Sequence, residues 1–423
     1  MDRDGWVRGD HLGLDMPAHV GGLRDGGAPF LTSAFQASGA LDAESTVRAV
    51  TELTEFSGGS TGRKALLSVD YDRSDLPVDL FVKFSRDFDD AERDGGRTQM
   101  EFEVRFALLS QRPGFPIVVP KCLFADYHSP SGTGLLITDR IPYGDNGIEP
   151  HYNKCMDYLM PDPVEHYRAL LGALGRIAGT HKAGRLPAAL VEHFPVDMER
   201  LSVGDRVPYT AEQLKRRVDR LAELAAVHPG LLPANVRSPT FISRLRHEVA
   251  RFPDREDAIW RWLAEHSDYV ALCHWNANVD NAWFWRSGDR LECGLMDWGC
   301  VGQMNVAMAI WGAMCSAETA MWDTHLDSLL DVFLTEFSAA GGPVLEPAVM
   351  KKHLMLYVAV MGLAWLLDVP SYLLRLLPQQ VTDRFDPRIA DSEQARSRLL
   401  MMTNFLNLWE TSDFVDALGG LEH

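Results

Sequence analysis

Residues 273–281 read Cys-His-Trp-Asn-Ala-Asn-Val-Asp-Asn, residues 291–299 read Leu-Glu-Cys-Gly-Leu-Met-Asp-Trp-Gly, and these two stretches decide the fold class. Residues 269–273 are apolar, which predicts a strand that ends where the polar loop 274–281 begins. The polar loop and the final Asp-Trp-Gly carry the side chains on which the functional interpretation depends.

A β-hairpin is predicted to connect the two stretches. The apolar runs 282–286 and 291–296 are separated by the turn-forming residues Ser-Gly-Asp-Arg at 287–290. Such a hairpin brings the amide of Asn281 and the carboxylate of Asp297 to the same end of a small sheet. Both are hard oxygen ligands, which suit Mg²⁺ held together with nucleotide phosphates.

This arrangement resembles the aminoglycoside phosphotransferase/choline kinase-like families, a branch of the protein-kinase-like fold. Those families carry a catalytic loop His-Gly-Asp-x-x-x-x-Asn and a later Asp-Trp or Asp-Phe-Gly. His274 matches the His, Asn281 matches the metal-binding Asn, and residues 297–299 match the metal-binding Asp segment. The resemblance implies ATP and Mg²⁺ as cofactors, Asn281 and Asp297 as metal ligands, and a catalytic-loop role for His274 in supporting loop geometry.

The catalytic loop departs from the family pattern at two positions. Asn276 stands at the family's catalytic Asp, and Trp275 stands at its small Gly. A carboxamide oxygen can accept a hydrogen bond from an acceptor hydroxyl and orient it, but it cannot take the proton. A general base contributes roughly 10²–10⁴-fold, whereas phosphoryl transfer draws most of its rate from positioning and charge stabilisation. The loss of the Asp therefore need not abolish transfer.

Three functions are compatible with Asn276. The first is an active ATP-dependent phosphotransferase on a small molecule, with Asn276 orienting the acceptor. The second is a nucleotide-binding pseudokinase with a regulatory or binding role, and the third is a kinase-like enzyme that transfers AMP. Asp280 is a weaker candidate for a displaced base, because the corresponding family position varies and often faces solvent. We favour the first function.

The small lobe is predicted to begin with two strands, 47–56 and 64–71, joined by a glycine-rich turn. Backbone N–H groups in such a turn can approach a phosphate closely, because no Cβ stands in the way. The candidate ATP-binding residues of the turn are Gly58, Gly59, Ser60 and Gly62.

A lysine lies inside the next predicted strand, 79–84. Burying an ammonium group is costly without a partner, so Lys83 is predicted to have one. In the resembled families this lysine bridges the α/β-phosphates and a helix glutamate. The helix predicted at 97–110 contains Glu103 in the family pattern Glu-Val-x-Phe, which favours Glu103 over Glu101.

Two more strands, 120–127 and 134–141, are predicted to complete an antiparallel sheet. The second ends in Leu-Leu-Ile-Thr-Asp-Arg-Ile-Pro-Tyr-Gly, which looks like the hinge between the two lobes of this fold. In that interpretation the backbone of Thr138 and Arg140 meets the adenine edge of ATP.

Two other segments of the first half carry weaker signals. Residues 1–29 are rich in Gly, Asp and His and predict an irregular lead-in, which we extend to residue 44. The acidic run 87–94 is predicted to be a solvated loop.

The sequence of the second half of the chain predicts mainly helices. Amphipathic or apolar helical periodicity appears in eight segments. They are 163–182, 210–227, 238–252, 255–265, 304–317, 321–340, 347–367 and 391–409.

Composition restricts the partners. The 423 residues carry 41 Lys and Arg against 59 Asp and Glu, a net charge of −18, which argues against a nucleic-acid surface. The longest apolar run, 354–367, is too short to span a membrane, which takes about 20 residues. The six scattered cysteines and an N-terminus without a signal-peptide pattern predict a cytoplasmic protein. The sequence does not predict an oligomeric state.

The sequence therefore predicts an α+β, two-lobed protein-kinase-like fold. The expected small lobe, 45–141, has an antiparallel sheet plus one helix and binds the nucleotide. The expected larger lobe, 142–423, is mostly helical and holds the catalytic loop 274–281, the metal-binding segment 297–299 and a pocket for the acceptor. The predicted activity is ATP- and Mg²⁺-dependent phosphorylation of a small molecule, at a hydroxyl.

Overall fold

The computed structural model describes residues 5–56, 58–59, 61–72, 76–198, 201 and 203–421, so Ser60 lies outside the described residues. Contacts within the chain divide it into two units. Unit 1 consists of Met1–Ile148, Leu186–Phe194 and Gly294–Val301, and unit 2 consists of Glu149–Arg185, Pro195–Cys293 and Gly302–His423.

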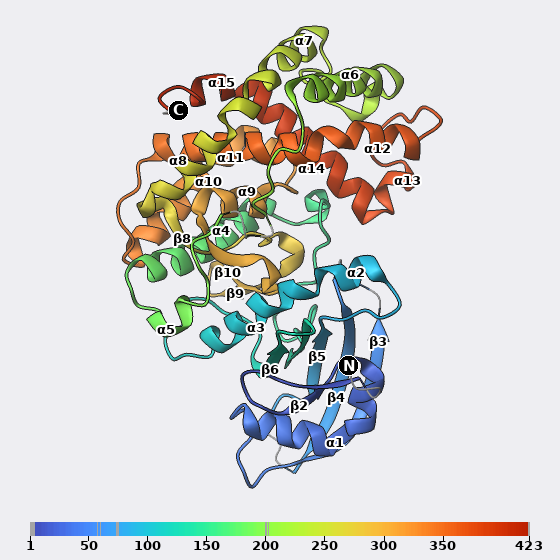
Figure 1. The fold of residues 1–423 in the computed structure, drawn as a ribbon, viewed down its shortest axis with the longest axis vertical. Coiled ribbons are helices and arrows are strands. Elements are labelled where there is room, and N and C mark those ends of the chain that lie inside the picture. Colours follow the sequence, from blue (N-terminus) through green and yellow to red (C-terminus); the bar gives the residue numbers. More distant parts are fainter. Residues whose placement is uncertain are drawn as a thin grey trace. The chain divides into compact units, whose positions relative to one another are not determined.

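Unit 1 is built on a five-stranded antiparallel sheet with the strand order β3-β4-β5-β7-β6 (Figure 1). All five strands were expected from their apolar runs. Their bounds are β3 Val47–Phe56, β4 Arg63–Tyr71, β5 Asp79–Phe84, β6 Cys122–His128 and β7 Thr133–Asp139. The register places Lys83 of β5 between Lys64 of β4 and Leu136 of β7.

The N-terminal segment is regular, so the prediction of an irregular lead-in is wrong. Strands β1 (Trp6–Arg8) and β2 (Asp15–Pro17) pair, and helix α1 (Val20–Ala37) follows. Apolar side chains of α1 share one core cluster with the sheet. They include Leu23, Phe30, Leu31, Ala34 and Phe35. A kink at Gly27, whose φ is +48°, interrupts the helix, so the sequence does not show a continuous helical period.

Helix α3 (Gln99–Ser110) packs on β6 and β7 and follows the short helix α2 (Ala91–Gly95). The segment Gly294–Val301 also belongs to unit 1, although a single cut after residue 141 would assign it to the larger lobe. Its backbone joins Val118 through a parallel bridge at Gly294 and the hydrogen bond from Leu295 N to Val118 O, 3.0 Å long. Asp297 is thus part of unit 1.

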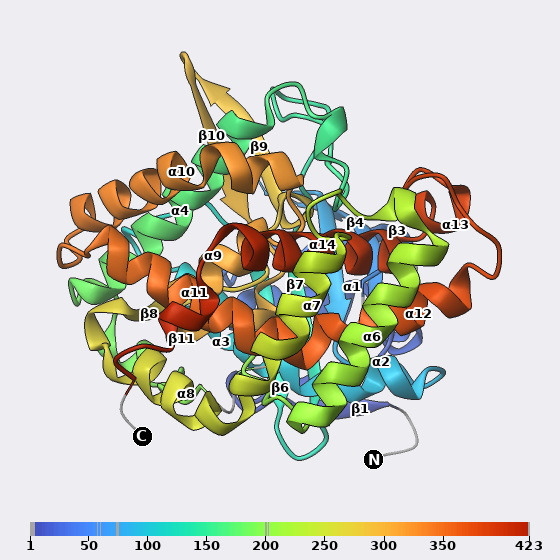
Figure 2. The ribbon, with the colours of Figure 1, turned by 90° about the horizontal axis from the view of Figure 1, so that it is seen from above.

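Unit 2 is mostly helical, as predicted (Figure 2). Its helices of eight or more residues are α4 Pro163–Lys182, α6 Ala211–Val227, α7 Pro239–Glu248, α8 Glu256–Glu265, α9 Val306–Met314, α10 Thr319–Ala339, α11 Pro347–Trp365, α12 Val369–Leu376 and α14 Glu393–Thr411. The short helices of the second half are α13 Pro387–Ala390 and α15 Phe414–Ala417, while α5 Ala188–Val191 falls in unit 1.

Helices α4 and α10 lie side by side in Figure 2 and pack closely. A Cβ on Gly179 of α4 would stand 2.1 Å from the carbonyl oxygen of Phe337, so the close approach requires glycine at that position.

The predicted strand and hairpin around the catalytic loop are present. Strand β8 (Val270–His274) pairs with β11 (Val301–Asn305), and β9 (Ala282–Ser287) pairs with β10 (Arg290–Leu295). The polar loop between β8 and β9 carries the catalytic-loop residues.

One helical stretch of the described residues, Pro347–Leu376, is long and apolar enough to cross a membrane by length and composition. Of its most apolar window, 78% is buried inside the protein. That burial agrees with the prediction of a core helix in this region.

Candidate active site

A buried ion-pair cluster forms the centre of the candidate site in unit 1. The Lys83 ammonium donates hydrogen bonds to Glu103 Oε2 at 2.7 Å and to Asp297 Oδ1 at 2.5 Å. Lys83 and Glu103 are each only 5% exposed. The predicted partner of the strand lysine is confirmed as Glu103, since Glu101 pairs with Arg105 one turn along the helix.

Asp297 is held in place by its neighbours in the chain. It adopts a left-handed conformation with a φ of +59°, which is uncommon for a residue other than glycine. The next residue, Trp298, stacks on Phe106 of α3 with ring centroids 3.6 Å apart, and its indole N–H donates to the carbonyl of Leu295. Because α3 also carries Glu103, one helix positions both carboxylates around the lysine.

The electrostatics of the cluster keep Lys83 charged. Burial acts to lower the pKa of Lys83, but Asp297 and Glu103 outweigh it and raise the pKa well above its ordinary value. Burial raises the pKa of Glu103, and the ammonium opposes that shift. The Asp297 side chain is 36% exposed, so an oxygen-bearing ligand can reach it from solvent.

A second lysine lies beside the cluster, and the sequence prediction missed it. Lys64 is directly opposite Lys83 in the sheet register. Burial lowers its pKa, Asp297 acts to raise it, and Lys83 acts to lower it again. A Cβ on Gly59 would stand 2.2 Å from Lys64 Nζ, so the ammonium lies directly beneath the glycine-rich turn. The alternation of residues along β4 and the strand pairing are the only sequence signals for it.

Arg93 holds the glycine-rich turn from one side. Its guanidinium donates to the carbonyl oxygens of Gly59 at 2.8 Å, Gly62 at 2.6 Å and Gly58 at 3.2 Å. Arg93 thus holds the three described glycines of the turn by their carbonyl groups. At Gly62 a Cβ would stand 1.9 Å from the carbonyl oxygen of Phe84, so that glycine is required by contact with the end of β5.

The acidic run 87–94 is exposed at residues 88–92, as predicted for a solvated loop, but its ends are tied to the protein and helix α2 begins within it. Asp87 is 2% exposed and forms ion pairs with Arg63 at 2.8 Å and with Arg93 at 3.1 Å. Burial acts to raise its pKa, but the hydrogen bond from Arg63 outweighs this effect and lowers it. Asp90 caps α2, and Asp94 pairs with Arg86 at 2.6 Å. The acidic run is therefore the support that orients Arg93 beneath the turn.

The predicted hinge residues lie at the end of β7. Thr138 sits between Phe81 and Cys122 in the sheet and is 8% exposed. The backbone N–H of Arg140 donates to the carbonyl of Asp79 at 3.0 Å. Because this N–H already donates within the protein, the carbonyl is the main-chain group of Arg140 that could contact adenine.

The catalytic-loop residues lie in unit 2. His274 ends β8 and is fully buried, and Asn281 is 8% exposed. The Asn281 amide nitrogen donates to the backbone carbonyl of Asn276 at 2.8 Å, so its amide oxygen is the atom offered to a ligand. Because Asn281 belongs to unit 2 and Asp297 to unit 1, their joint role at one metal ion stays a prediction.

Trp275 replaces the small family residue without opening the loop. Its ring is buried, and the indole N–H donates to the hydroxyl of Tyr357 at 2.8 Å. Gly312 of α9 leaves room for it, because a Cβ there would stand 1.9 Å from the Trp275 carbonyl oxygen. Trp275 is therefore part of the core of unit 2.

The amide oxygen of Asn276 accepts hydrogen bonds within the protein. Its Oδ1 accepts from Asn278 Nδ2 at 2.8 Å and lies 3.4 Å from Lys154 Nζ. Lys154, which the sequence prediction missed, is 122 residues away in the chain and carries no local motif. Since the amide oxygen already has two donors, the amide nitrogen is the group that Asn276 presents to a ligand. The role of this oxygen in orienting an acceptor hydroxyl stays a prediction.

The residues of the cluster in unit 1 fit a magnesium–phosphate ligand better than a metal held by protein alone. Among the described residues there is no group of three His, Cys, Asp or Glu side chains with metal-site spacing. Mg²⁺ commonly takes one or two carboxylates and completes its coordination with phosphate oxygens and water. Asp297 supplies such a carboxylate beside the ammonium of Lys83.

Comparisons with known proteins found matches among solved structures alone. No family model and no curated protein matches the sequence. Among solved structures, a microcompartment-associated aminopropanol kinase matches with 13% sequence identity and a TM-score of 0.44. The match covers 93% of this chain and 99% of that chain. A choline kinase from Cryptosporidium parvum matches with 11% identity, 86% and 90% coverage and a TM-score of 0.42. A spectinomycin phosphotransferase solved with ADP and spectinomycin matches with 10% identity, 88% and 94% coverage and a TM-score of 0.37. With every TM-score below 0.5, we base the function on the contacts of this chain's own residues.

Proposed function

We propose that this chain is a cytoplasmic, ATP- and Mg²⁺-dependent phosphotransferase that acts on a small-molecule acceptor. The observation that carries the proposal is the cluster of Lys83, Glu103 and Asp297 in unit 1. A buried lysine with two carboxylates has little value for stability. Its value is as a fixed cation for phosphate oxygens beside a carboxylate for the metal.

Each residue of the cluster has a distinct role in this proposal. Lys83 binds phosphate oxygens of the nucleotide, and Glu103 holds its ammonium in place. Asp297, whose side chain is partly exposed and next to Lys83, binds the divalent ion. When bound, this ion neutralises phosphate charge. The turn at Gly58–Gly62, fixed by Arg93, covers the phosphates with backbone N–H groups.

The catalytic loop supplies the acceptor side of the proposal. Asn276 contacts the acceptor through its amide nitrogen, and buried His274 maintains the loop. Asn281 is assigned to the metal from the sequence motif, and its outward amide oxygen is compatible with that assignment. The intact cluster in unit 1 favours an active enzyme over a decayed, regulatory one.

The test is transfer of label from ATP labelled at the γ- or the α-phosphate, in the presence of Mg²⁺ and a metabolite extract. Label moving from the γ-phosphate supports the proposal. Label moving from the α-phosphate would instead identify an AMP-transferring enzyme, and nucleotide binding without any transfer would identify a pseudokinase. The Lys83→Met variant should lose transfer, whereas Lys351→Met, which changes an exposed lysine of unit 2, should retain it.

A further inference from the structure

We propose that the acceptor is a small organic acid whose ionised oxygen binds Asn276 and Lys154 and whose apolar body occupies a cavity of unit 2. This inference rests on the phosphotransferase function proposed above and names its substrate class.

The orientation of the Asn276 amide is fixed by a neighbour that can only donate. An ammonium has three donors and no acceptor, so the Asn276 atom facing Lys154 must be the amide oxygen. Asn278 donates to the same oxygen, while its own Oδ1 accepts from Ser316 at 2.6 Å. The remaining face of Asn276 therefore consists of N–H donors. A group that binds there must accept hydrogen bonds.

Lys154 adds a positive charge at the same place. Its one recorded hydrogen bond is the 3.4 Å contact to Asn276, and among the described residues no carboxylate lies within ion-pair distance of Nζ. Burial acts to lower the pKa of Lys154, but the more distant charge of Asp280 helps to raise it, so the side chain is a cation at neutral pH. Asp280 thus balances this cation from a distance, and the ammonium keeps hydrogen-bond donors for a ligand oxygen.

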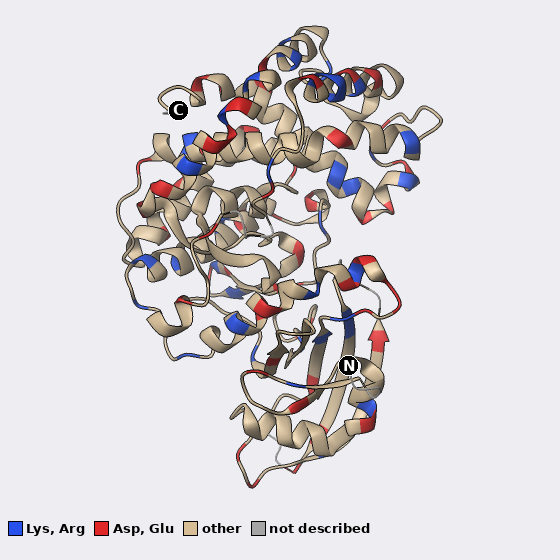
Figure 3. Cartoon of the chain, in the orientation of Figure 1, with Lys and Arg blue, Asp and Glu red and all other residues tan. Residues whose placement is uncertain are grey.

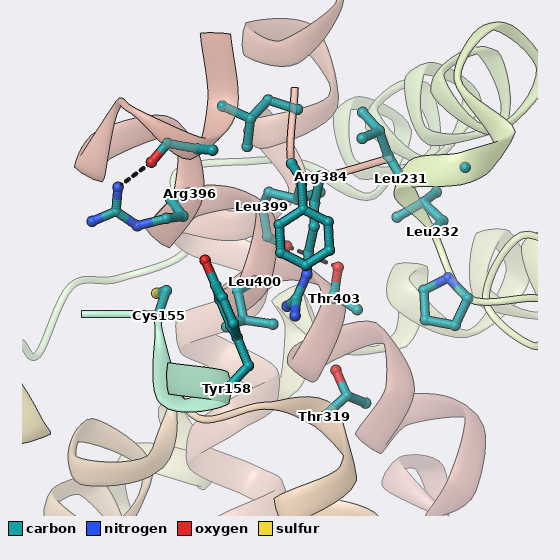
Figure 4. A pocket seen from close by; sticks show the side chains of 15 residues that line it. Cys155, Tyr158, Leu231, Leu232, Thr319, Arg384, Arg396, Leu399, Leu400 and Thr403 are labelled. Carbon is teal, nitrogen blue, oxygen red and sulfur yellow. Dashed lines mark hydrogen bonds between the residues drawn. The ribbon is translucent and has the colours of Figure 1, made fainter. Parts of the chain in front are cut away.

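A cavity of about 270 Å³ in unit 2 is lined by Cys155, the residue that follows Lys154 in the chain (Figure 4). Figure 4 shows Tyr158, Leu400 and Arg384 turned toward the same space. Leucines and aromatic rings make up much of the wall, and the only charged lining residues are Arg384 and Arg396. Figure 3 shows basic and acidic positions side by side on the ribbon in the region of α12, α13 and α14. Arg384 pairs with Glu318 at 2.9 Å, whereas Arg396 donates to the backbone carbonyls of Lys154 and Ala390. In a chain with a net charge of −18, an apolar cavity whose charged lining residues are both basic suits a guest with an apolar body and one anionic group.

The backbone connects the cavity directly to Lys154. The next residue, Cys155, lines the cavity and has a φ of +61° in the left-handed region. Arg396, another lining residue, donates from Nε to the carbonyl of Lys154 at 3.2 Å. The strained position of Cys155 and the bond from Arg396 fix the backbone from which the Lys154 side chain extends. In the proposal, an acid bound with its body in the cavity extends its ionised end past Cys155 toward Lys154 and Asn276.

The chemistry of an ionised acceptor matches the absence of a base at position 276. An oxygen of the acid forms a bond to the γ-phosphorus, and the bond from that phosphorus to the bridging oxygen of ADP breaks. The electron pair of the broken bond leaves with ADP, and the negative charge of the acid passes into the phosphoryl product, so charge is balanced without release of a proton. A neutral alcohol would have to lose a proton, which neither the amide nitrogen of Asn276 nor a protonated Lys154 can take.

The inference is tested first by binding, without turnover. Phenylacetate and its neutral counterpart 2-phenylethanol have the same ring and nearly the same length, and they are titrated into the full-length protein by calorimetry. Phenylacetate should bind at least 10-fold more tightly, and Lys154→Gln should weaken phenylacetate by about 10- to 100-fold while leaving 2-phenylethanol unchanged. Lys351→Gln is the matched control and should bind both compounds as the wild type does. Equal binding of the two compounds, or no binding of phenylacetate, would overturn the inference.

Turnover then separates the two sources of an ionised oxygen. With Mg·ATP, a carboxylate acceptor gives an acyl phosphate that hydroxylamine traps as a hydroxamate, whereas 4-nitrophenolate, an ionised hydroxyl, gives a stable ester. Either product supports the inference. Transfer only to neutral alcohols would overturn it and leave the phosphotransferase function standing, whereas loss of Mg·ATP binding itself would count against the function.

A reversal variant adds a result that a purely structural role of Asn276 would not produce. Asn276→Asp places a carboxylate beside Lys154, so it should raise KM for acids at least 10-fold and leave the KM for ATP unchanged. If the variant uses acids as well as the wild type does, the ionised oxygen does not bind at Asn276.

Discussion

The Lys83–Glu103 pair allows stability and function to be separated in one set of variants. Lys83→Met removes the cation and leaves Glu103 buried next to an apolar side chain. Breaking a buried pair from one side typically costs about 3–5 kcal/mol, because the remaining charge has no partner. Glu103→Leu should cost less, because Lys83 keeps its 2.5 Å contact to the partly exposed Asp297.

The double variant Lys83→Met/Glu103→Leu removes both buried charges together. Replacing a buried pair by apolar side chains of similar volume is commonly neutral or stabilising. We therefore expect the double variant to lie within about 1 kcal/mol of the wild type, so that the coupling energy is at least about 2 kcal/mol. Mg·ATP binding should nevertheless be lost in the double variant, as in Lys83→Met.

The pH dependence of the destabilisation in Lys83→Met tests whether the unpaired charge of Glu103 is its cause. Burial already raises the pKa of Glu103 in the wild type, and removal of the opposing ammonium raises it further. A carboxyl with a raised folded-state pKa contributes stability that is full below its unfolded-state pKa and is lost as the pH rises through the folded-state value. The destabilisation of Lys83→Met should thus be smaller at pH 5 than at pH 8.

The assay is equilibrium denaturation in urea followed by circular dichroism, with nucleotide binding measured on the same preparations. Destabilisations that simply add in the double variant would refute the reasoning. A double variant that still binds Mg·ATP as the wild type does would refute the assignment of the cluster to the nucleotide.

Three further predictions concern the turn and a buried carboxyl. Arg93→Ala frees three turn carbonyls and should weaken Mg·ATP binding about 10-fold or more, whereas Arg97→Ala should not, as calorimetry would show. Gly62→Ala should cost more than about 3 kcal/mol of unfolding free energy, because a Cβ there meets a backbone oxygen at 1.9 Å. Gly39→Ala, at a positive φ in open space, should cost only about 1–2 kcal/mol. Burial raises the pKa of Asp157 to about 6, so this carboxyl should cost the wild type about 2 kcal/mol of stability between pH 4 and pH 7. Asp157→Asn should remove that loss in urea denaturation at the two pH values.

Much of the fold was predictable because it depends on local patterns. The five strands of the sheet are apolar runs bounded by turn residues, and the helices of unit 2 show clear periodicity. The first part of helix α1 was missed because four glycines and a proline interrupt its apolar face, while burial against the sheet stabilises it. Such a helix depends on tertiary packing that no local pattern reveals.

The site was predictable where burial itself imposes a requirement. A lysine inside an apolar strand needs a counter-charge, and the helix offered few candidates, so Glu103 could be named. Arg93 and Lys154 were not predictable, because their contacts depend on how loops fold. Arg93 is the only basic residue of the acidic run 87–94, which is the one signal that pointed to it. Lys154 meets Asn276 across 122 residues of chain.

The central claim is that Asp297 and Lys83 in unit 1 bind a magnesium nucleotide, and calorimetric titration of ATP tests it most directly. The titration is made with and without Mg²⁺ on the wild type, Asp297→Asn and Lys351→Met. We predict Mg²⁺-dependent binding that is about 30-fold weaker or more in Asp297→Asn and unchanged in Lys351→Met. Equal Mg·ATP affinity in the wild type and Asp297→Asn would contradict the claim.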